Sequence, residues 1–307
     1  MRIGLIDVDG HNFPNLALMK LSAYHKQQGD SVSWADGLLE YDKVYMSKIF
    51  DDSADYTSVI KADEIIRGGR AYDKKVKLPN EIESMCPDYT LYGITDTAYG
   101  YLTRGCPRAC SFCDVVNIEG RNSHKVADLS QFWNGQKYIK LLDPNLLACK
   151  DHANLLEQLI DSKAYIDITQ GFDIRLINDK NIDLIKQMKI KMIHFAWDNP
   201  NDDLVGKFKE FKETTQIDRR KLVVYVLVNY NSAMEQDLYR IYALRDLGYD
   251  PFVMVYKDNG KAVSQETINL ARWVNKKITF RLFDNFKQYD VHYRSRKVNV
   301  DGQGNIV

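Results

Sequence analysis

The stretch YIKLLDPNLLACKDHANLLEQLIDSKAYIDIT, residues 138–169, decides the fold class of this chain. Its first part, Tyr138 to Leu142, is predicted to be a strand. Asp151 to Ser162 is predicted to be a helix, and Tyr165 to Thr169 a second strand. A helix between two strands is the connection that joins neighbouring parallel strands. The stretch therefore predicts an α/β fold with a parallel sheet.

The same alternation continues on both sides of this stretch. Further strands are expected at Thr97–Thr103, Met192–Trp197, Leu222–Val228, Phe252–Tyr256 and Ile278–Leu282. Further helices are expected at Asn181–Met188, Leu204–Phe211 and Val263–Val274, and from Ser232 to Leu247, where Ser232 and Glu235 have capping-box spacing. Successive repeats of this kind predict a partial barrel of the (β/α)6 type, with its site at the carboxyl ends of the strands.

A smaller unit precedes the barrel. Arg2–Asp7 is expected to be a strand, and Asn15 is expected to cap a helix that runs to Gln28. Short strands at Ser31–Trp34, Lys43–Met46 and Ala62–Gly68 complete a small doubly wound, Rossmann-like domain. The predicted organisation is this domain at 1–75, a connector at 76–95, the barrel at 96–290 and a carboxyl-terminal tail at 291–307.

The composition is that of a folded globular protein. The 307 residues are 45% hydrophobic and 27% charged, with a mean hydropathy of −0.41, which excludes disordered and collagen-like chains. No apolar run is long enough for a membrane span, and MRIGLIDVDG does not resemble a signal peptide, so a cytoplasmic protein without a membrane partner is expected. The 42 Lys and Arg balance 42 Asp and Glu, which disfavours nucleic acid as a partner while leaving room for a local basic strip.

Three cysteines lie on one short segment, Cys106-Pro107-Arg108-Ala109-Cys110-Ser111-Phe112-Cys113. Thiolates are the ligands of iron–sulfur clusters, and three of them hold three irons of a cubane cluster and leave the fourth iron open. No further cysteine follows until Cys149, unlike in a ferredoxin. A zinc site that recruits His124 as its fourth ligand is the alternative.

This motif resembles that of the radical S-adenosylmethionine (radical SAM) superfamily. The resemblance covers about residues 95 to 290, and it rests on Thr103-Arg104-Gly105-Cys106-Pro107, Phe112-Cys113, Glu119-Gly120-Arg121 and Ser123. Within this superfamily, the chain is similar to the members that carry a cobalamin-binding-like domain upstream of the barrel. The resemblance implies a [4Fe–4S] cluster on Cys106, Cys110 and Cys113, with SAM bound to the open iron. It also implies an electron donor such as flavodoxin or ferredoxin, and hydrogen abstraction from an unidentified substrate by a 5′-deoxyadenosyl radical.

The same resemblance suggests where SAM would bind. Phe112 matches the position whose backbone lies beside the adenine, and Asp143, with Asn145 second, follows the strand that binds the SAM amino group. Gln170 and Arg175 follow the next strand, where Arg175 is expected to pair with the SAM carboxylate. Asp198 is expected at the ribose or the substrate. The alternatives are a polar turn at Asp143–Asn145 and a surface ion pair for Arg175.

The segment Asp9-Gly10-His11-Asn12-Phe13-Pro14 partly matches the loop of cobalamin proteins whose histidine binds cobalt. Asp9 and His11 are therefore candidate cobalamin residues, although Pro14 replaces the glycine of that pattern. A scaffold that has lost the vitamin is favoured over a cobalamin-dependent radical SAM methyltransferase. A hypothesis of another class is a non-catalytic iron–sulfur or zinc-binding module that regulates or scaffolds.

Overall fold

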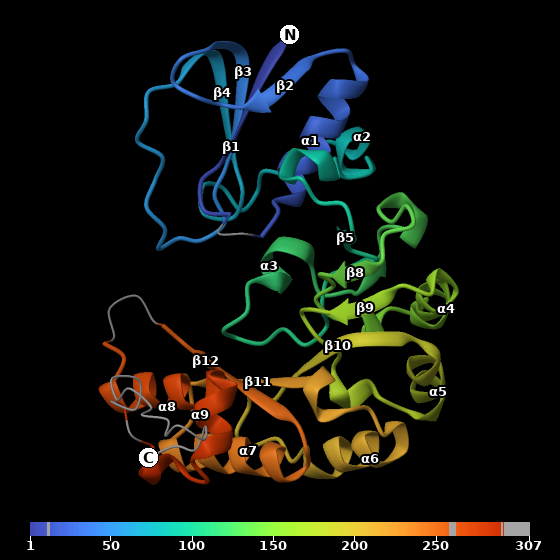
Figure 1. Cartoon of the computed structure of the whole chain (residues 1–307), viewed down its shortest axis with the longest axis vertical. Helices are drawn as coiled ribbons and strands as arrows, with labels where there is room; N and C mark the ends of the chain where they lie inside the picture. Colours follow the sequence, from blue (N-terminus) through green and yellow to red (C-terminus); the bar gives the residue numbers. More distant parts are fainter. Residues whose placement is uncertain (11–12, 258–261, 290, 292–307) are drawn as a thin grey trace, which may run out of the picture. The chain divides into compact units, whose positions relative to one another are not determined.

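The computed structural model describes residues 1–10, 13–257, 262–289 and 291 (Figure 1). It is a mixed α/β structure with parallel sheets, which confirms the predicted class. The chain divides into two compact units, Met1–Ile193 and His194–Val307. The division falls within strand β10 (Lys189–Ala196), whereas the predicted boundaries lie at other residues.

The first unit begins with a small parallel sheet. Its strands β1 (Arg2–Asp7), β2 (Ser31–Trp34), β3 (Glu40–Ser47) and β4 (Lys61–Gly68) have the order β2-β1-β3-β4. Helix α1 (Leu16–Gln27) starts at Asn15, whose side-chain oxygen accepts from the N–H groups of Ala17 and Leu18, as predicted for an N-cap.

Helix and loops cover the two faces of this sheet differently. Ile3 and Leu5 pack against Leu18 and Leu21 of α1. A second buried cluster, Tyr41, Val44 and Met46 with Ile6, is covered by residues such as Tyr56 and Tyr72, which precede and follow β4. The described segments joining β2 to β3 and β3 to β4 contain no helix, so this sheet has the parallel strands of a doubly wound unit without its full set of crossover helices.

A second parallel sheet follows a connector that contains α2 (Asn80–Glu83) and the 3-10 turn Tyr89–Tyr92. In the first unit it comprises β5 (Thr97–Gly100), β8 (Tyr138–Leu141), β9 (Tyr165–Ile168) and the start of β10. Helices α4 (His152–Ser162) and α5 (Asp179–Gln187) connect β8 to β9 and β9 to β10. Their Leu155, Leu159, Ile182 and Ile185 are buried, as are Ile139 and Ile166 of the strands.

The predicted strand Thr97–Thr103 is divided in the structure. After β5 the chain forms β6 (Thr103–Arg104), which pairs antiparallel with β7 (His124–Lys125). The cysteine segment and helix α3 (Val115–Glu119) lie between these two short strands. The two short strands therefore hold together the ends of the longer segment that contains the three cysteines and α3.

The second unit continues the parallel pattern with β11 (Leu222–Val228) and β12 (Asp250–Val255). Its helices are α6 (Val205–Thr215), α7 (Met234–Asp246), α8 (Gln265–Asn275) and α9 (Lys277–Leu282). The capping box predicted at Ser232 and Glu235 is not formed, because the N-cap of α7 is Ala233, which has no side-chain acceptor. Only the reverse bond is present, in which the side chain of Gln236 accepts from the N–H of Ala233.

The predicted strand Ile278–Leu282 is wrong, since this segment is helix α9. Ile278 and Leu282 are exposed, whereas Phe280 is buried with its ring centroid 5.0 Å from that of Trp273. The hydroxyl of Thr279 donates to the carbonyl oxygens of Trp273 and Lys276. Packing against α8 thus overrides the strand preference of a β-branched segment.

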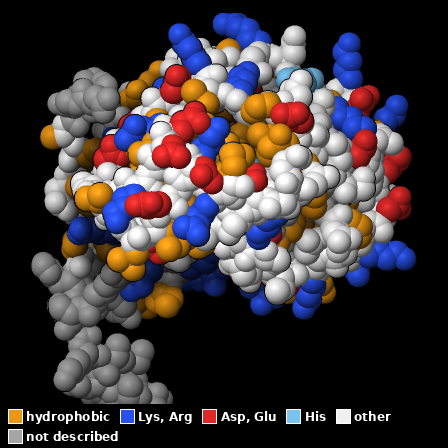
Figure 2. Space-filling model, turned by 90° about the horizontal axis from the view of Figure 1, so that it is seen from above, with side chains coloured by type: hydrophobic (Ala, Val, Ile, Leu, Met, Phe, Trp, Pro, Cys, Tyr) orange, Lys and Arg blue, Asp and Glu red, His pale blue; other side chains and the backbone are white. Residues whose placement is uncertain are grey.

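None of the helices in the described part of the chain has the length and apolar character needed to cross a membrane. On the face drawn in Figure 2, basic and acidic side chains are interspersed. This mixture agrees with the balanced charge of the sequence.

Candidate functional site

The cysteine loop, Cys106–Cys113, has a backbone conformation that its sequence makes accessible. Gly105 has φ +84°, and a Cβ atom there would lie 2.3 Å from the carbonyl oxygen of Asn122. Only glycine fits this combination of positive φ and close approach. The N–H of Cys106 donates to Gly120 O (3.1 Å), and that of Cys113 donates to Cys110 O (3.0 Å). The loop is thus anchored at its start and closed on itself at its end.

The three thiols of this loop are half-buried, whereas Cys149 is buried away in its own turn. Burial raises the pKa of the Cys113 thiol, and the nearby Cys110 and Cys106 raise it further. Among the described residues, no group of three or more His, Cys, Asp or Glu side chains is arranged to hold a metal ion. The loop still offers the thiolate donors that a cubane cluster requires, each of which binds a different iron.

Asn145 is a predicted site residue that lies beside one of these thiols. It is 3% exposed, and its Nδ2 lies 3.6 Å from Cys106 Sγ. Its Oδ1 is buried and has no hydrogen-bond partner in the described part of the chain. A buried acceptor without a donor lowers the stability of the folded protein. Asn145 Oδ1 is therefore suited to accept a hydrogen bond from a bound ligand.

A cavity of about 500 Å³ adjoins this asparagine. It is lined by residues from the cysteine loop and from the segments after β8 and β9, which include Pro107, Arg108, Asn145, Cys149, His152 and Asp173. Its volume lies in the range of small-molecule and cofactor sites. The cavity therefore gives a ligand access to Asn145 from the carboxyl ends of these strands.

Asp143 follows β8, and its carboxylate is hydrogen-bonded to other residues of the chain. It is 2% exposed, and its carboxylate accepts from the N–H of Leu102, from the N–H of Thr103 and from the Thr103 hydroxyl (2.7 Å). Burial raises its pKa to about 6, although these donors act in the opposite direction. Asp143 thus holds the chain just before the cysteine loop.

The other predicted SAM residues are placed as follows. Phe112 is half-buried within the cysteine loop, and Gln170 is exposed just after β9. Arg175 forms an ion pair with Asp173 (2.9 Å), which is also 3.8 Å from Arg108. Asp198 follows β10 in the second unit, and its carbonyl oxygen accepts from Arg240. Of the predicted SAM residues, Phe112 is part of the cysteine loop, and Asn145 lies beside it.

Glu119 supports the loop from the carboxyl end of α3. Its carboxylate accepts from Gly105 N (3.0 Å) and pairs with Arg104 (2.7 Å). The Arg104 guanidinium lies 3.5 Å from the centroid of the Tyr101 ring, a cation–π contact. This chain of contacts links the cysteine loop to a second cavity. His124, the alternative zinc ligand, is exposed in β7, where its Nδ1 lies 3.0 Å from Asn122 O.

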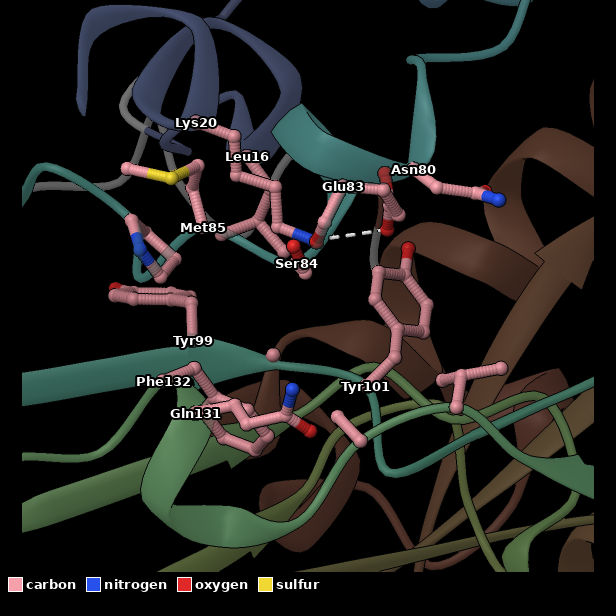
Figure 3. Close-up of a pocket in the computed structure, with 14 residues that line it drawn as sticks. Leu16, Lys20, Asn80, Glu83, Ser84, Met85, Tyr99, Tyr101, Gln131 and Phe132 are labelled. Atoms are coloured by element: carbon pink, nitrogen blue, oxygen red, sulfur yellow. Dashed lines mark hydrogen bonds and ion pairs between the residues drawn. The ribbon is translucent and has the colours of Figure 1, made fainter. Parts of the chain in front are cut away.

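The second cavity, about 350 Å³, lies in the first unit between α1 and α2 on one side and β5 on the other (Figure 3). Lys20 and Glu83, which form a 2.8 Å ion pair, come from the helical side, and Tyr99, Tyr101 and Phe132 from the strand side (Figure 3). Gly100 permits the close packing of Phe132, because a Cβ atom there would lie 2.4 Å from that ring. The walls of this cavity come from segments that are separate along the chain, so no local sequence pattern defines it.

The loop after β1 contains Asp9, one of the candidate cobalamin residues. Asp9 is 2% exposed, and its carboxylate accepts from the N–H groups of Ile49 (3.0 Å) and Phe50 (2.7 Å). It thereby fixes the turn that leaves β3. His11 lies outside the described residues.

Arg240 is a buried polar residue that sequence reasoning missed. It is fully buried in α7 and donates to the carbonyl oxygens of Trp197, Asp198 and Leu227, besides pairing with Asp237. Arg240 therefore ties together the carboxyl ends of β10 and β11. The missed signal was an arginine three residues after an aspartate on a helix, a spacing that is far more common on exposed surfaces.

Comparison with models of known protein families finds no match for this chain. Comparison with curated proteins also finds no similar sequence.

Proposed function

We propose that this protein is a radical SAM enzyme that binds a [4Fe–4S] cluster and SAM at the cysteine loop and abstracts hydrogen from a substrate. The observation that carries the proposal is the Cys106, Cys110 and Cys113 motif on one closed loop, with the unpartnered Oδ1 of Asn145 beside it. Three thiolates, rather than four, leave one iron open for a ligand.

The residues of the chain would have distinct roles. Cys106, Cys110 and Cys113 would hold the cluster, and Asn145 Oδ1 would accept a hydrogen bond from the ammonium group of SAM. When bound, the cluster supplies the electron that cleaves the sulfonium of SAM to methionine and a 5′-deoxyadenosyl radical.

Residues around the loop would position it. Asp143 and Glu119 hold the backbone at Leu102–Thr103 and at Gly105, on the amino-terminal side of Cys106. Arg108 lines the neighbouring cavity and meets Arg175 at Asp173, and these arginines would provide cations for the carboxylate of SAM.

The test begins with anaerobic reconstitution of the whole chain with iron and sulfide. About four irons per chain are expected, followed by formation of methionine and 5′-deoxyadenosine when dithionite and SAM are added. Cys86→Ala should behave as the unmodified chain, because Cys86 is exposed in the connector, away from the cysteine loop and its cavity. A colourless protein that retains one zinc, and makes no 5′-deoxyadenosine, would overturn the proposal in favour of a structural metal module.

A further inference from the structure

One face of the second sheet carries tyrosine and lysine side chains in place of apolar ones. Along β5, β8, β9 and β10, the residues Ala98, Ile139, Ile166 and Ile190 are buried. The residues that alternate with them are Tyr99, Tyr138, Lys140, Tyr165 and Lys189. Because side chains of a strand alternate between the two faces, these residues share the face opposite to the buried one. We refer to Tyr99, Tyr138, Lys140, Tyr165, Lys189 and Lys191 as the Tyr–Lys face.

The strand register places these side chains in adjoining rows. Tyr138 is opposite Tyr165, and their ring centroids are 5.7 Å apart. Tyr165 is opposite Lys189, whose Nζ is 5.9 Å from the tyrosine ring. In the next row Lys140 is opposite Tyr99, with its Nζ 5.6 Å from that ring. Phe13, from the segment between β1 and α1, packs on the β5 end of these rows, with its ring centroid 5.6 Å from that of Tyr99 and 5.6 Å from Lys140 Nζ. The accessible surface therefore runs across β8, β9 and β10.

β10 contributes a second lysine to this surface. Lys191 is two residues after Lys189, and residues two apart in a strand point to the same face. The register between β9 and β10 shifts between Ile190 and Met192, so Lys191 is the extra residue of a bulge. Its Nζ lies 4.1 Å from the centroid of the Tyr138 ring.

The lysines of this surface lack acidic partners. Lys140, Lys189 and Lys191 form no ion pair with a carboxylate in the described part of the chain, nor does the adjacent Lys137. Elsewhere lysines do pair, as Lys43 does with Glu64 on β3 and β4. Asp167 is the acidic residue within the rows, and it is only 9% exposed. The surface therefore carries an excess of positive charge, although the whole chain is neutral.

The rings are accessible enough to contact a ligand. Tyr165 is 42% exposed, and Tyr99 and Tyr138 are half-buried. Adjacent strands are about 4.8 Å apart, so the span from β8 to β10 is about 10 Å. At 3.4 Å per stacked nucleotide, this span accommodates about three nucleotides. Aromatic side chains on an open sheet are one way in which proteins stack single-stranded bases.

We propose that the Tyr–Lys face binds single-stranded nucleic acid, with bases stacked on Tyr165 and Tyr138 and phosphates near Lys140, Lys189 and Lys191. The lysines have no acidic partner, so they favour an anionic ligand. The tyrosine rings favour a ligand that carries flat rings to stack on them. The carboxyl-terminal segment of the chain does not complement this surface, because Arg294, Arg296 and Lys297 outnumber Asp301. A second copy of this neutral chain supplies no surplus of negative charge either.

The test measures the fluorescence anisotropy of labelled fifteen-nucleotide single strands, of RNA and of DNA, with the whole protein. At least one single strand should bind more tightly than a duplex of the same length. The slope of log binding constant against log salt concentration should be about −2, since three lysines contact phosphates at about −0.7 each. A double variant, Lys189→Gln with Lys191→Gln, should reduce the magnitude of this slope by about 1.4.

Variants of the aromatic residues test the stacking. Tyr165→Ala should weaken binding by about 5- to 150-fold, and Tyr165→Phe should retain it, because the ring is kept. The matched control for the double lysine variant is Lys207→Gln with Lys209→Gln on α6, where both lysines already pair with glutamates. This control should leave the binding and its salt dependence unchanged. Circular dichroism and thermal unfolding should show that each variant is folded.

Several results would overturn the inference. These are binding of no single strand, equal binding of the duplex, unchanged binding by Tyr165→Ala, or competition by AMP as effective as that by the unlabelled strand. The inference does not depend on the proposed enzymatic activity. Cys113→Ala, which should lose the cluster, should bind the strand as the unmodified chain does, so failure of one proposal can be told from failure of the other.

Discussion

The loop around Asp9 and the loop around Cys106–Cys113 are both candidate cofactor sites, and they differ in what their polar groups contact. The Asp9 carboxylate accepts from two backbone N–H groups of the turn after β3. At the cysteine loop, Asn145 Oδ1 has no partner in the described residues, and three thiols are half-buried together. Polar atoms that remain available near a cavity distinguish a binding site from a structural junction.

The largest effect is expected from the cysteines. Cys113→Ala should lose the iron of the reconstituted protein, because two thiolates are left for a cluster that needs at least three in this motif. Cys149→Ala should keep it, since Cys149 lies outside the loop. Iron and sulfide analysis after anaerobic desalting measures both. Full iron content in Cys113→Ala would contradict the assignment of the cysteine loop as a cofactor site.

Asp9→Ala should destabilise the protein by about 4 kcal/mol, because two N–H groups lose a charged, buried acceptor at about 2 kcal/mol each. The neighbouring Asp51 is exposed, and Asp51→Ala should change the free energy of unfolding by less than about 0.5 kcal/mol. Urea unfolding measures both variants. If Asp9→Ala were as stable as the unmodified chain but lost a bound corrin, the Asp9 loop would be a cofactor site after all.

Asp143 predicts a pH dependence of stability. Its pKa is raised from 3.8 to about 6 in the folded protein, so the folded state holds the proton more tightly than the unfolded state. The contribution of this residue to stability should therefore fall as pH rises from 4 to 6, by about 1.4 kcal/mol per pH unit and about 3 kcal/mol in total. The comparison is urea unfolding of the unmodified chain and of Asp143→Asn across this pH range. Equal slopes for the two proteins would contradict the prediction.

The smallest effect is expected at Asn145. Asn145→Ala should raise the dissociation constant of SAM for the reconstituted protein about tenfold, the value of one hydrogen bond to a charged group. Its free energy of unfolding should change little, because Oδ1 has no partner to lose among the described residues. Equilibrium dialysis and urea unfolding give the two quantities. A large loss of stability with unchanged SAM affinity would make Asn145 a structural residue like Asp9.

Local patterns in the sequence predicted most elements of the fold. Asn15 was identified as a cap, and α4, α5 and the strands beside them lie within a few residues of their predicted bounds. Ile278–Leu282 failed, because the packing of Phe280 on Trp273 decides its conformation. Asp143 was proposed as a ligand-binding residue, whereas the structure shows it accepting from Leu102 and Thr103, which precede the cysteine loop.

The spacing of the three cysteines and the alternation of strands and helices are properties of the sequence by itself. Each depends on residues that are close along the chain, so no distant contact is needed to identify it. The tertiary structure decided which polar groups are hydrogen-bonded, since the partners of Asp9 and Asp143 come from segments that are distant along the chain. It also decided that Lys191 lies over Tyr138, because the two residues come from strands that are not neighbours in the sequence. Such pairings follow from long-range packing, which local sequence patterns do not encode.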